Sequence, residues 1–180
     1  MILTREAIRQ SVATGSIVIQ PFDEELLNPN SYNYRLGRFL KISPRSVLDP
    51  LAAVEWDEIE IPEDGVLLEP GRLYLGHTME RIGSKSFVTS LIGRSSIGRL
   101  GVFLQISADL GHQGAIHSWT LELTAVQPTR VYAGMRIGQV SFWVPTGEPR
   151  EYQGRYGSEA KPREYILGRD EILRTARAIR

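Results

Sequence analysis

The sequence predicts a mainly β domain, a barrel or a sandwich built from many short strands. Apolar and polar residues alternate in a series of short segments, which is the period of a half-buried strand, and glycine or proline separates these segments. The strands follow one another without long helices between them, so alternating βαβ units are not predicted. At 180 residues the chain is long enough for one domain with its own core.

One short helix is predicted near the N-terminus, over residues 5–13, between an N-cap at Thr4 and a stop at Gly15. A polar, proline-bearing excursion is expected over 43–65. The predicted strands share alternation or an apolar run with flanking turn residues, and they cover 16–22, 28–42, 65–70, 72–78, 86–93, 101–109, 118–126, 129–134 and 136–144.

The charge balance and the cysteine content exclude several classes of protein. Lysine and arginine together number 21, as do aspartate and glutamate, so no bulk charge favours nucleic acid or an anionic membrane surface as partner. The chain has no cysteine, which excludes disulfides, thiolate nucleophiles and the cysteine-containing zinc site of base deaminases. The charged N-terminus is unlike a signal peptide, and no apolar run approaches the ~20 residues of a membrane span, so we expect a cytoplasmic protein.

The segment GRSSIGRLG, residues 93–101, has the composition of an anion-binding loop. Three glycines, two serines and two arginines fall within nine residues. Glycine lets backbone N–H groups approach a phosphate, serine hydroxyls donate hydrogen bonds, and arginine side chains pair with oxyanions. A glycine-rich turn with solvated arginines is the alternative.

Glu122 is an acid in the middle of an alternating strand. The polar face of that strand is either wet or looks into a site where Glu122 does proton chemistry, and the residues alone leave both open. Two histidines precede it, His112 and His117, but their spacing of five fits no helical metal pair. Because His77 is distant in sequence and no other ligand is evident, we predict no metal-binding residues.

Two features of the C-terminal part also have two interpretations. Alternation places Gln139 inward, either in a site or as an amide that lines a barrel. The glycine-rich, aromatic and basic segment 151–163 fits a lid over a bound anion or a flexible tail. Helical spacing over 164–180 predicts a terminal helix.

Taken together, these segments resemble the dCTP deaminase family, within the trimeric dUTPase-like superfamily. The match runs nearly end to end and in order: the opening 1–37, then GRSSIGRLG, TLEL, AGMRIGQVSF and YQGRYG. The resemblance implies a distorted, mostly antiparallel β-barrel or jelly roll as a single domain over 1–180, with 151–180 as lid and tail. It also implies a homotrimer with active sites between subunits.

For activity, the resemblance implies zinc-independent hydrolytic deamination of a cytidine nucleotide, dCTP to dUTP and ammonia by default. Glu122 matches the family's catalytic glutamate, which activates a water for attack at C4 of cytosine and relays protons to N3 and the departing amine. Ser95 and Arg99 match residues that position this water and the glutamate.

Mg²⁺ is expected on the nucleotide phosphates, not in a protein cage. The candidate nucleotide-binding residues are Arg94, Ser96, Ala108, His112, Gln113, Gln139, Tyr152 and Arg155.

The loop before the catalytic strand departs from the family's pattern. Where relatives carry a sequence such as Asp-Pro-Gly-Trp, this chain has HQGA, residues 112–115. His112 replaces the acid that activates the attacking water in the dUTPase branch, so pyrophosphatase activity ranks below deamination. Ala115 replaces an aromatic residue that packs on the deoxyribose, so we expect relaxed sugar specificity, toward CTP or a modified cytidine nucleotide.

Two alternatives to a deaminase stay open at this point: a nucleoside triphosphate pyrophosphatase of the dUTPase type, and a non-catalytic trimer that binds a pyrimidine nucleotide. Ammonia release indicates deamination, pyrophosphate release indicates hydrolysis, and both together indicate a bifunctional enzyme. Retention of Ser95, Arg99 and Glu122 argues against the non-catalytic alternative.

Overall fold

The computed structural model describes residues 1–104, 108–148, 150–154 and 160–164, and these form a mainly β architecture, as predicted. The helices are α1 (Arg5–Ala13), the 3-10 helix η1 (Glu24–Leu26) and α2 (Ser95–Gly98). The strands are β1 (Val18–Gln20), β2 (Leu27–Asn28), β3 (Ser31–Arg35), β4 (Phe39–Ile42), β5 (Asp57–Glu60), β6 (Val66–Leu68), β7 (Tyr74–His77), β8 (Arg81–Gly83), β9 (Val88–Gly93), β10 (Val102–Leu104), β11 (Leu110–Gly111), β12 (Ile116–His117), β13 (Thr120–Ala125), β14 (Thr129–Val131) and β15 (Arg136–Trp143).

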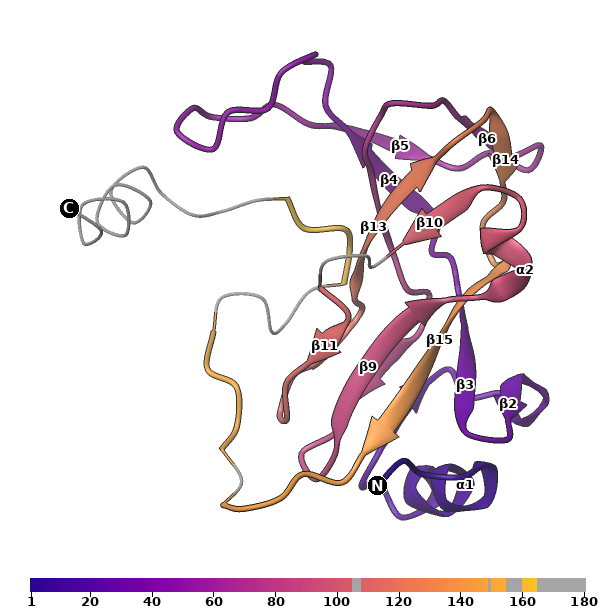
Figure 1. Ribbon diagram of the computed structural model, residues 1–180, viewed down its shortest axis with the longest axis vertical. Coiled ribbons are helices and arrows are strands. Elements are labelled where there is room, and N and C mark those ends of the chain that lie inside the picture. Colours follow the sequence, from indigo (N-terminus) through magenta and orange to yellow (C-terminus); the bar gives the residue numbers. More distant parts are fainter. Residues whose placement is uncertain (105–107, 149, 155–159, 165–180) are drawn as a thin grey trace.

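Two five-stranded antiparallel sheets form the body of the molecule (Figure 1). One has the strand order β10-β13-β7-β4-β5 and the other β11-β9-β15-β3-β2. A three-stranded sheet, β1-β8-β12, and the pair β14-β6 complete the fold. Both large sheets contribute to one hydrophobic core, Leu121 and Leu123 from the first and Leu91, Val140 and Phe142 from the second. The predicted fold class is therefore confirmed.

The N-terminal region follows the prediction with one difference. Helix α1 has the predicted bounds, but the single strand expected over 28–42 is two strands, β3 and β4. The chain turns at Gly37, where a Cβ would lie only 2.1 Å from the imidazole of the residue that ends β7. Tyr32, Tyr34 and Leu36 are fully buried, in accord with the predicted shared face.

Five strands were not predicted: β5, which has four residues, and four shorter strands. Strands β2, β8, β11 and β12 have two or three residues each, too few to show alternation. The GRSSIGRLG segment contains α2, where a loop was expected, and the excursion over 43–65 contains β5. The terminal helix predicted over 164–180 lies, apart from its first residue, outside the described residues. No helix in the described part of the chain is long and apolar enough to cross a membrane.

A buried ion pair joins β3 to the segment that follows β7. The side chain of Glu80 is 0% exposed, and its carboxylate accepts hydrogen bonds from the Arg35 side chain (2.6 Å) and from the Arg35 backbone N–H (2.9 Å). Two charge-assisted bonds compensate for the burial of the carboxylate. Removal of either partner leaves the other poorly solvated.

We therefore predict that Glu80→Ala lowers the free energy of unfolding by about 3 kcal/mol, because it leaves the Arg35 guanidinium unpaired. Glu60→Gln is the control, since Glu60 pairs with Arg38, whose side chain is 69% exposed. That variant should lose less than about 1 kcal/mol. Urea unfolding of both variants measures the difference, and equal losses would contradict a special role for the buried pair.

Candidate functional site

A cavity of about 620 Å³ lies beside strand β13, within the size range of small-molecule sites. Its wall includes residues of β13, the preceding loop, the excursion after β4 and the C-terminal segment. The lining residues are Leu48, Asp49, Pro50, Val54, Trp56, Leu73, Leu75, Ala108, Leu110, His112, Ala115, His117, Trp119, Thr120, Glu122, Tyr152, Arg163 and Glu164.

The period of strand β13 places Glu122 on the cavity wall. Leu121 and Leu123 are fully buried in the core, so Thr120 and Glu122 point to the opposite face, and both line the cavity. In the antiparallel pairing with β7, Glu122 lies directly across from Leu75. The polar face of this strand therefore looks into a site and not into bulk water.

Trp119 is a fixed part of the wall. Its indole N–H donates to the carbonyl of Ile82 at 2.9 Å. Gly111 leaves room for the ring, since a Cβ there would lie 2.6 Å from it. The imidazole of His117 packs on the indole with ring centroids 4.2 Å apart. Its Nδ1 lies 3.0 Å from the Ser118 carbonyl, and because a carbonyl only accepts, Nδ1 carries the proton.

The loop before the strand also holds the start of the C-terminal segment. The rings of His112 and Tyr152 stack at 5.3 Å with an interplanar angle of 17°, and the Tyr152 N–H donates to the Gln113 carbonyl at 2.7 Å. Ala115 lies between His112 and His117 in the sequence. It is only 3% exposed, and it lines the cavity. The part of the lining that this loop supplies therefore combines aromatic rings with one small side chain.

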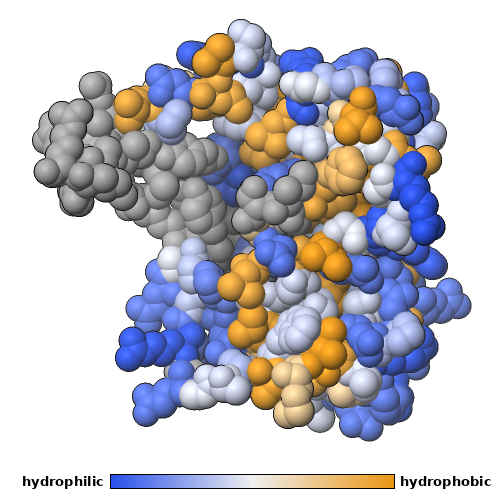
Figure 2. Space-filling view, in the orientation of Figure 1, coloured by the Kyte–Doolittle hydropathy of each residue, from blue (hydrophilic) through white to orange (hydrophobic). Residues whose placement is uncertain are grey.

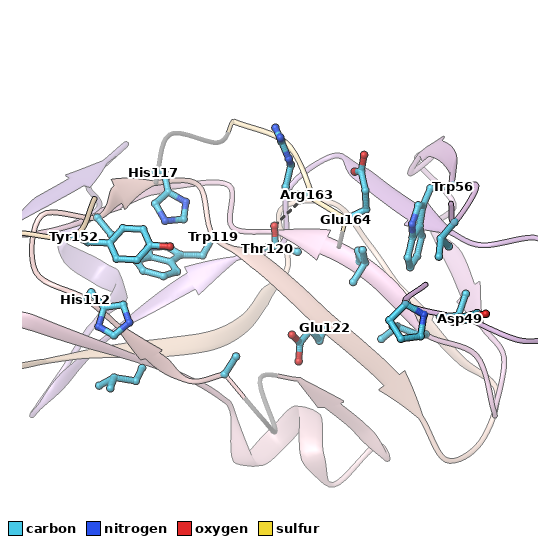
Figure 3. A pocket seen from close by; sticks show the side chains of 18 residues that line it. Asp49, Trp56, His112, His117, Trp119, Thr120, Glu122, Tyr152, Arg163 and Glu164 are labelled. Atoms are coloured by element: carbon cyan, nitrogen blue, oxygen red, sulfur yellow. Dashed lines mark hydrogen bonds between the residues drawn. The ribbon is translucent and has the colours of Figure 1, made fainter. Parts of the chain in front are cut away.

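The cavity has two chemically different ends (Figure 3). His112, His117, Trp119 and Tyr152 lie at one end, which we name the ring-lined end. Thr120 and Glu122 lie in the middle. Asp49, Trp56 and Glu164 lie at the opposite end. We name it the apolar end because the lining residues next to Asp49 and Trp56 in the chain are the apolar Leu48, Pro50 and Val54.

The structure brings together only part of the predicted site. Glu122, Ala108, His112 and Tyr152 line the cavity. The residues of the GRSSIGRLG segment, Arg94, Ser95, Ser96 and Arg99, lie at or in α2 and do not line it; Ser95, Ser96 and Arg99 are exposed.

Two predicted nucleotide-binding side chains have structural partners instead. The Gln113 amide donates to the Lys85 carbonyl at 3.4 Å, and the Gln139 amide oxygen accepts from the Ser31 hydroxyl at 2.8 Å. Neither glutamine lines the cavity, since each amide is directed toward its partner in the protein. Arg155 lies outside the described residues.

Sequence reasoning missed Arg163 and Trp56. The Arg163 N–H donates to the Thr120 hydroxyl at 2.9 Å, which ties the C-terminal segment to β13 (Figure 3). Arg163 is the one lysine or arginine among the described lining residues. No local pattern signals these contacts, since they join segments far apart in sequence. Across the described ranges, no three metal-ligating side chains cluster closely enough to hold an ion.

We predict that Tyr152→Ala loosens the segment 151–154, because it removes the stack on His112 while it keeps the backbone bond to Gln113. An aromatic pair is worth about 0.5–1.5 kcal/mol, so the amide of residue 152 should exchange roughly 2- to 13-fold faster. Hydrogen exchange resolved to this amide measures the change. Tyr132→Ala, at an exposed ring outside the cavity, is the control. Unchanged exchange in Tyr152→Ala would show that the stack contributes nothing.

Comparison with known proteins agrees with this geometry. A model of the family described as dCTP deaminase-like matches residues 2–144. A protein of Leptospira biflexa named "dCTP deaminase, dUMP-forming" is 43% identical over 171 residues, which cover 94% of this chain and 98% of the relative. A protein of Clostridium acetobutylicum with the same name is 40% identical over 173 residues, 96% of this chain and 99% of the relative.

Among solved structures, the chain is similar to 2'-deoxycytidine 5'-triphosphate deaminase from Agrobacterium tumefaciens. The TM-score is 0.65 at 24% sequence identity, and the match covers 80% of this chain and 48% of that one, so this chain spans about half of the larger chain. This likeness supports the dUTPase-like fold alone. The family model and the relatives, which match along nearly the whole chain, show that this chain belongs to the dCTP deaminase-like family.

Proposed function

We propose that this protein deaminates dCTP and then hydrolyses the product to dUMP. The observation that carries the proposal is the position of Glu122, which lies on the wall of a nucleotide-sized cavity between its ring-lined and apolar ends. The names of relatives 40–43% identical over nearly the full chain support it.

Glu122 supplies the proton transfers of the deamination. Its carboxylate takes a proton from a water, the hydroxide adds to C4 of cytosine, and the proton passes to N3. The tetrahedral carbon then expels its amino group, which leaves as ammonia after it receives a proton through the same carboxyl group. The step consumes one water and converts dCTP to dUTP. A single side chain thus acts as base and then as acid in one turnover. The carbonyl of Ala108, on the cavity wall, is available to hold the water.

The expected product changes from dUTP, the default of the sequence analysis, to dUMP. The relatives are named for formation of dUMP, which requires a second water to cleave dUTP into dUMP and pyrophosphate. The pyrophosphatase alternative thereby becomes a second step of one enzyme. His112 occupies the position of the acid expected for that step, and it lines the cavity. Measurement of pyrophosphate beside ammonia therefore decides whether this chain carries out both steps.

The phosphate-binding residues reach the cavity from a neighbouring copy of the chain. Arg94, Ser95, Ser96 and Arg99 do not line the cavity of their own chain, where the described lining residues include one cation, Arg163. A triphosphate needs more positive charge than that cavity offers. A partner's α2 supplies two arginines and two serines, and Ser95 and Arg99 from that helix then position the water and Glu122.

Exposed apolar residues near α2 support such an assembly. Leu100, Phe103 and Val126 are exposed on or next to β10 and β13, and α2 contacts β10. Figure 2, in the same orientation as Figure 1, shows apolar side chains among hydrophilic ones on this side of the molecule. A homotrimer that covers these side chains and completes each cavity is the proposed state.

Mg²⁺ accompanies the nucleotide in this proposal. GRSSIGRLG contains no carboxylate, so hard oxygen ligands for the ion come from the phosphates themselves. The ion supplies charge neutralisation for the triphosphate when bound. The single-domain division, the lid over 151–180 and the cytoplasmic location stay predictions.

Relaxed sugar specificity is the second proposal, and Ala115 favours it. Ala115 lines the cavity with a methyl group, and its N–H donates to the carbonyl of His112, a residue of the ring-lined end, at 3.2 Å. An aromatic side chain at this position would occupy the space of a 2'-hydroxyl. CTP or a sugar-modified cytidine nucleotide fits the space that Ala115 leaves.

Glu122→Gln should lower the rate of ammonia release from dCTP by at least about 10²–10⁴-fold, because the amide cannot carry the proton. Ammonia and pyrophosphate are assayed in parallel on the wild type, where equal amounts are expected. Glu60→Gln, at an exposed side chain that does not line the cavity, controls for the loss of a carboxylate and should keep full activity. Pyrophosphate without ammonia in the wild type would overturn the deaminase, and ammonia without pyrophosphate would restore dUTP as the product.

Ala115→Phe should restore discrimination against ribose. In the wild type, kcat/KM for CTP is expected within about tenfold of that for dCTP, and the variant should lose at least about tenfold more activity with CTP than with dCTP. Urea unfolding checks that the variant is folded, since Ala115 is buried. Full wild-type activity with dCTP and none with CTP would contradict relaxed specificity.

A further inference from the structure

The apolar end of the cavity has no counterpart in an unmodified cytidine nucleotide. Leu75 lies directly across the β13–β7 ladder from Glu122, and Leu73, just before β7, also lines the cavity. The excursion after β4 adds Leu48, Pro50 and Val54 to the lining, with Leu48 and Pro50 exposed, so the apolar end is open to solvent on that side. The sugar and phosphates of a nucleotide are polar, so a compartment with this lining is suited to a different group.

Trp56 contributes a hydrogen-bond donor, its indole N–H, to the apolar end. Its indole nitrogen is buried, and it has no hydrogen-bond partner among the residues that the structure describes. A buried indole N–H normally donates to an acceptor. The compartment therefore suits an apolar group, with a place for a hydrogen-bond acceptor beside Trp56.

The charges around the cavity orient the nucleotide. Asp49 and Glu164 carry carboxylates at the apolar end, and Lys41 already pairs with Glu164. The Asp49 carboxylate and the apolar walls disfavour a triphosphate there, by repulsion and by loss of its hydration respectively, while Lys41 compensates the charge of Glu164. The phosphates and the sugar therefore lie toward the ring-lined end or beyond it.

The geometry of a pyrimidine then determines which edge of the base faces the apolar end. N1, which carries the sugar, and C4 lie on opposite sides of the ring. If N3 and C4 lie at Glu122, as the proton transfer to N3 requires, and N1 points toward the ring-lined end, C5 lies on the other side of C4 from N3, and the edge formed by C4 and C5 faces the apolar end. Of these two atoms, C5 carries a hydrogen that a substituent can replace without loss of the amino group.

We propose that the apolar end of the cavity is a subsite for a substituent on C5 of cytosine, so that the substrates of this enzyme include C5-substituted deoxycytidine nucleotides. The inference rests on the proposed deaminase function and names its substrate class. The apolar walls hold the carbon part of the substituent, and the Trp56 N–H donates to an oxygen on it.

The test compares kcat/KM for dCTP, 5-methyl-dCTP and 5-propynyl-dCTP with the wild type. We expect the propynyl compound to be deaminated within about tenfold of dCTP, or faster, because its substituent gains apolar contacts. A value more than about 100-fold below that of dCTP would overturn the subsite, since it would mean that something other than the base occupies the space.

A matched pair of variants tests where the substituent lies. Leu48→Trp fills the apolar end, whereas Val47→Trp adds the same side chain at a neighbouring residue that is 74% exposed and does not line the cavity. Leu48→Trp should lower kcat/KM for 5-propynyl-dCTP more than about tenfold relative to dCTP, and Val47→Trp should leave the ratio unchanged. An equal effect of Leu48→Trp on both substrates would assign the compartment to protein contacts, such as those with a second copy.

Trp56→Phe tests the indole N–H on its own. It should lower the preference for 5-hydroxymethyl-dCTP over 5-methyl-dCTP by roughly 2- to 13-fold, the effect of one hydrogen bond. An unchanged preference would remove Trp56 from the proposal.

Failure of the subsite and failure of the proposed function give different results. Turnover of dCTP without turnover of the C5 analogues overturns the subsite alone. If dCTP itself is not deaminated, the proposed function fails, and calorimetric binding of dCTP and 5-propynyl-dCTP to the wild type then tests the subsite. Tighter binding of the propynyl compound would still support it, and equal or weaker binding would overturn it.

Discussion

The two-residue period of strand β13 is the constraint on which the rest of the site depends. The same six residues contribute two leucines to the core and present Thr120 and Glu122 to the cavity. Burial of the leucines determines the register in which β13 pairs with its neighbours, since a shift of one residue would expose the leucines and bury the acid. The stability of the core and the position of the Glu122 carboxylate therefore depend on the same register of the strand.

Around this strand, separate segments give the cavity different chemical character along its length. The loop before β13 supplies rings that are held by one another and by backbone carbonyls, with Trp119 fixed at Ile82 and His112 stacked on Tyr152. The excursion after β4 supplies aliphatic side chains and Trp56. A carboxylate between a polar aromatic end and an apolar end can distinguish the sugar side of a nucleotide from the far edge of its base. Among the described residues that line the cavity, Arg163 is the one lysine or arginine, which is the physical reason to expect that the complete site includes a second copy.

The sequence predicted the class of the fold and the strand that carries Glu122 because both depend on local patterns. Alternation revealed β13 and placed Glu122 opposite its leucines, and capping and glycine signals bounded α1. The two-residue strands β2, β11 and β12 carry too little pattern to be recognised in the sequence. Gly37 was interpreted as part of one strand because its close approach to β7 is a tertiary contact. For the same reason the sequence did not reveal that Trp56 and Arg163 line the cavity, or that the amides of Gln113 and Gln139 have protein partners. The nucleotide-binding roles of Gln113 and Gln139 stay predictions. Residue type indicates what a side chain can do, but only the packed structure determines what it faces.

The central claim is that a cytidine nucleotide lies in this cavity with C4 at Glu122 and its phosphates against a neighbouring chain. A crystal structure of the Glu122→Gln variant with dCTP and Mg²⁺ tests it most directly. The account predicts the cytosine beside the substituted residue, the sugar at the ring-lined end and the triphosphate at Arg94 and Ser96 of a second copy. A triphosphate at the apolar end, or a nucleotide bound away from β13, would contradict it.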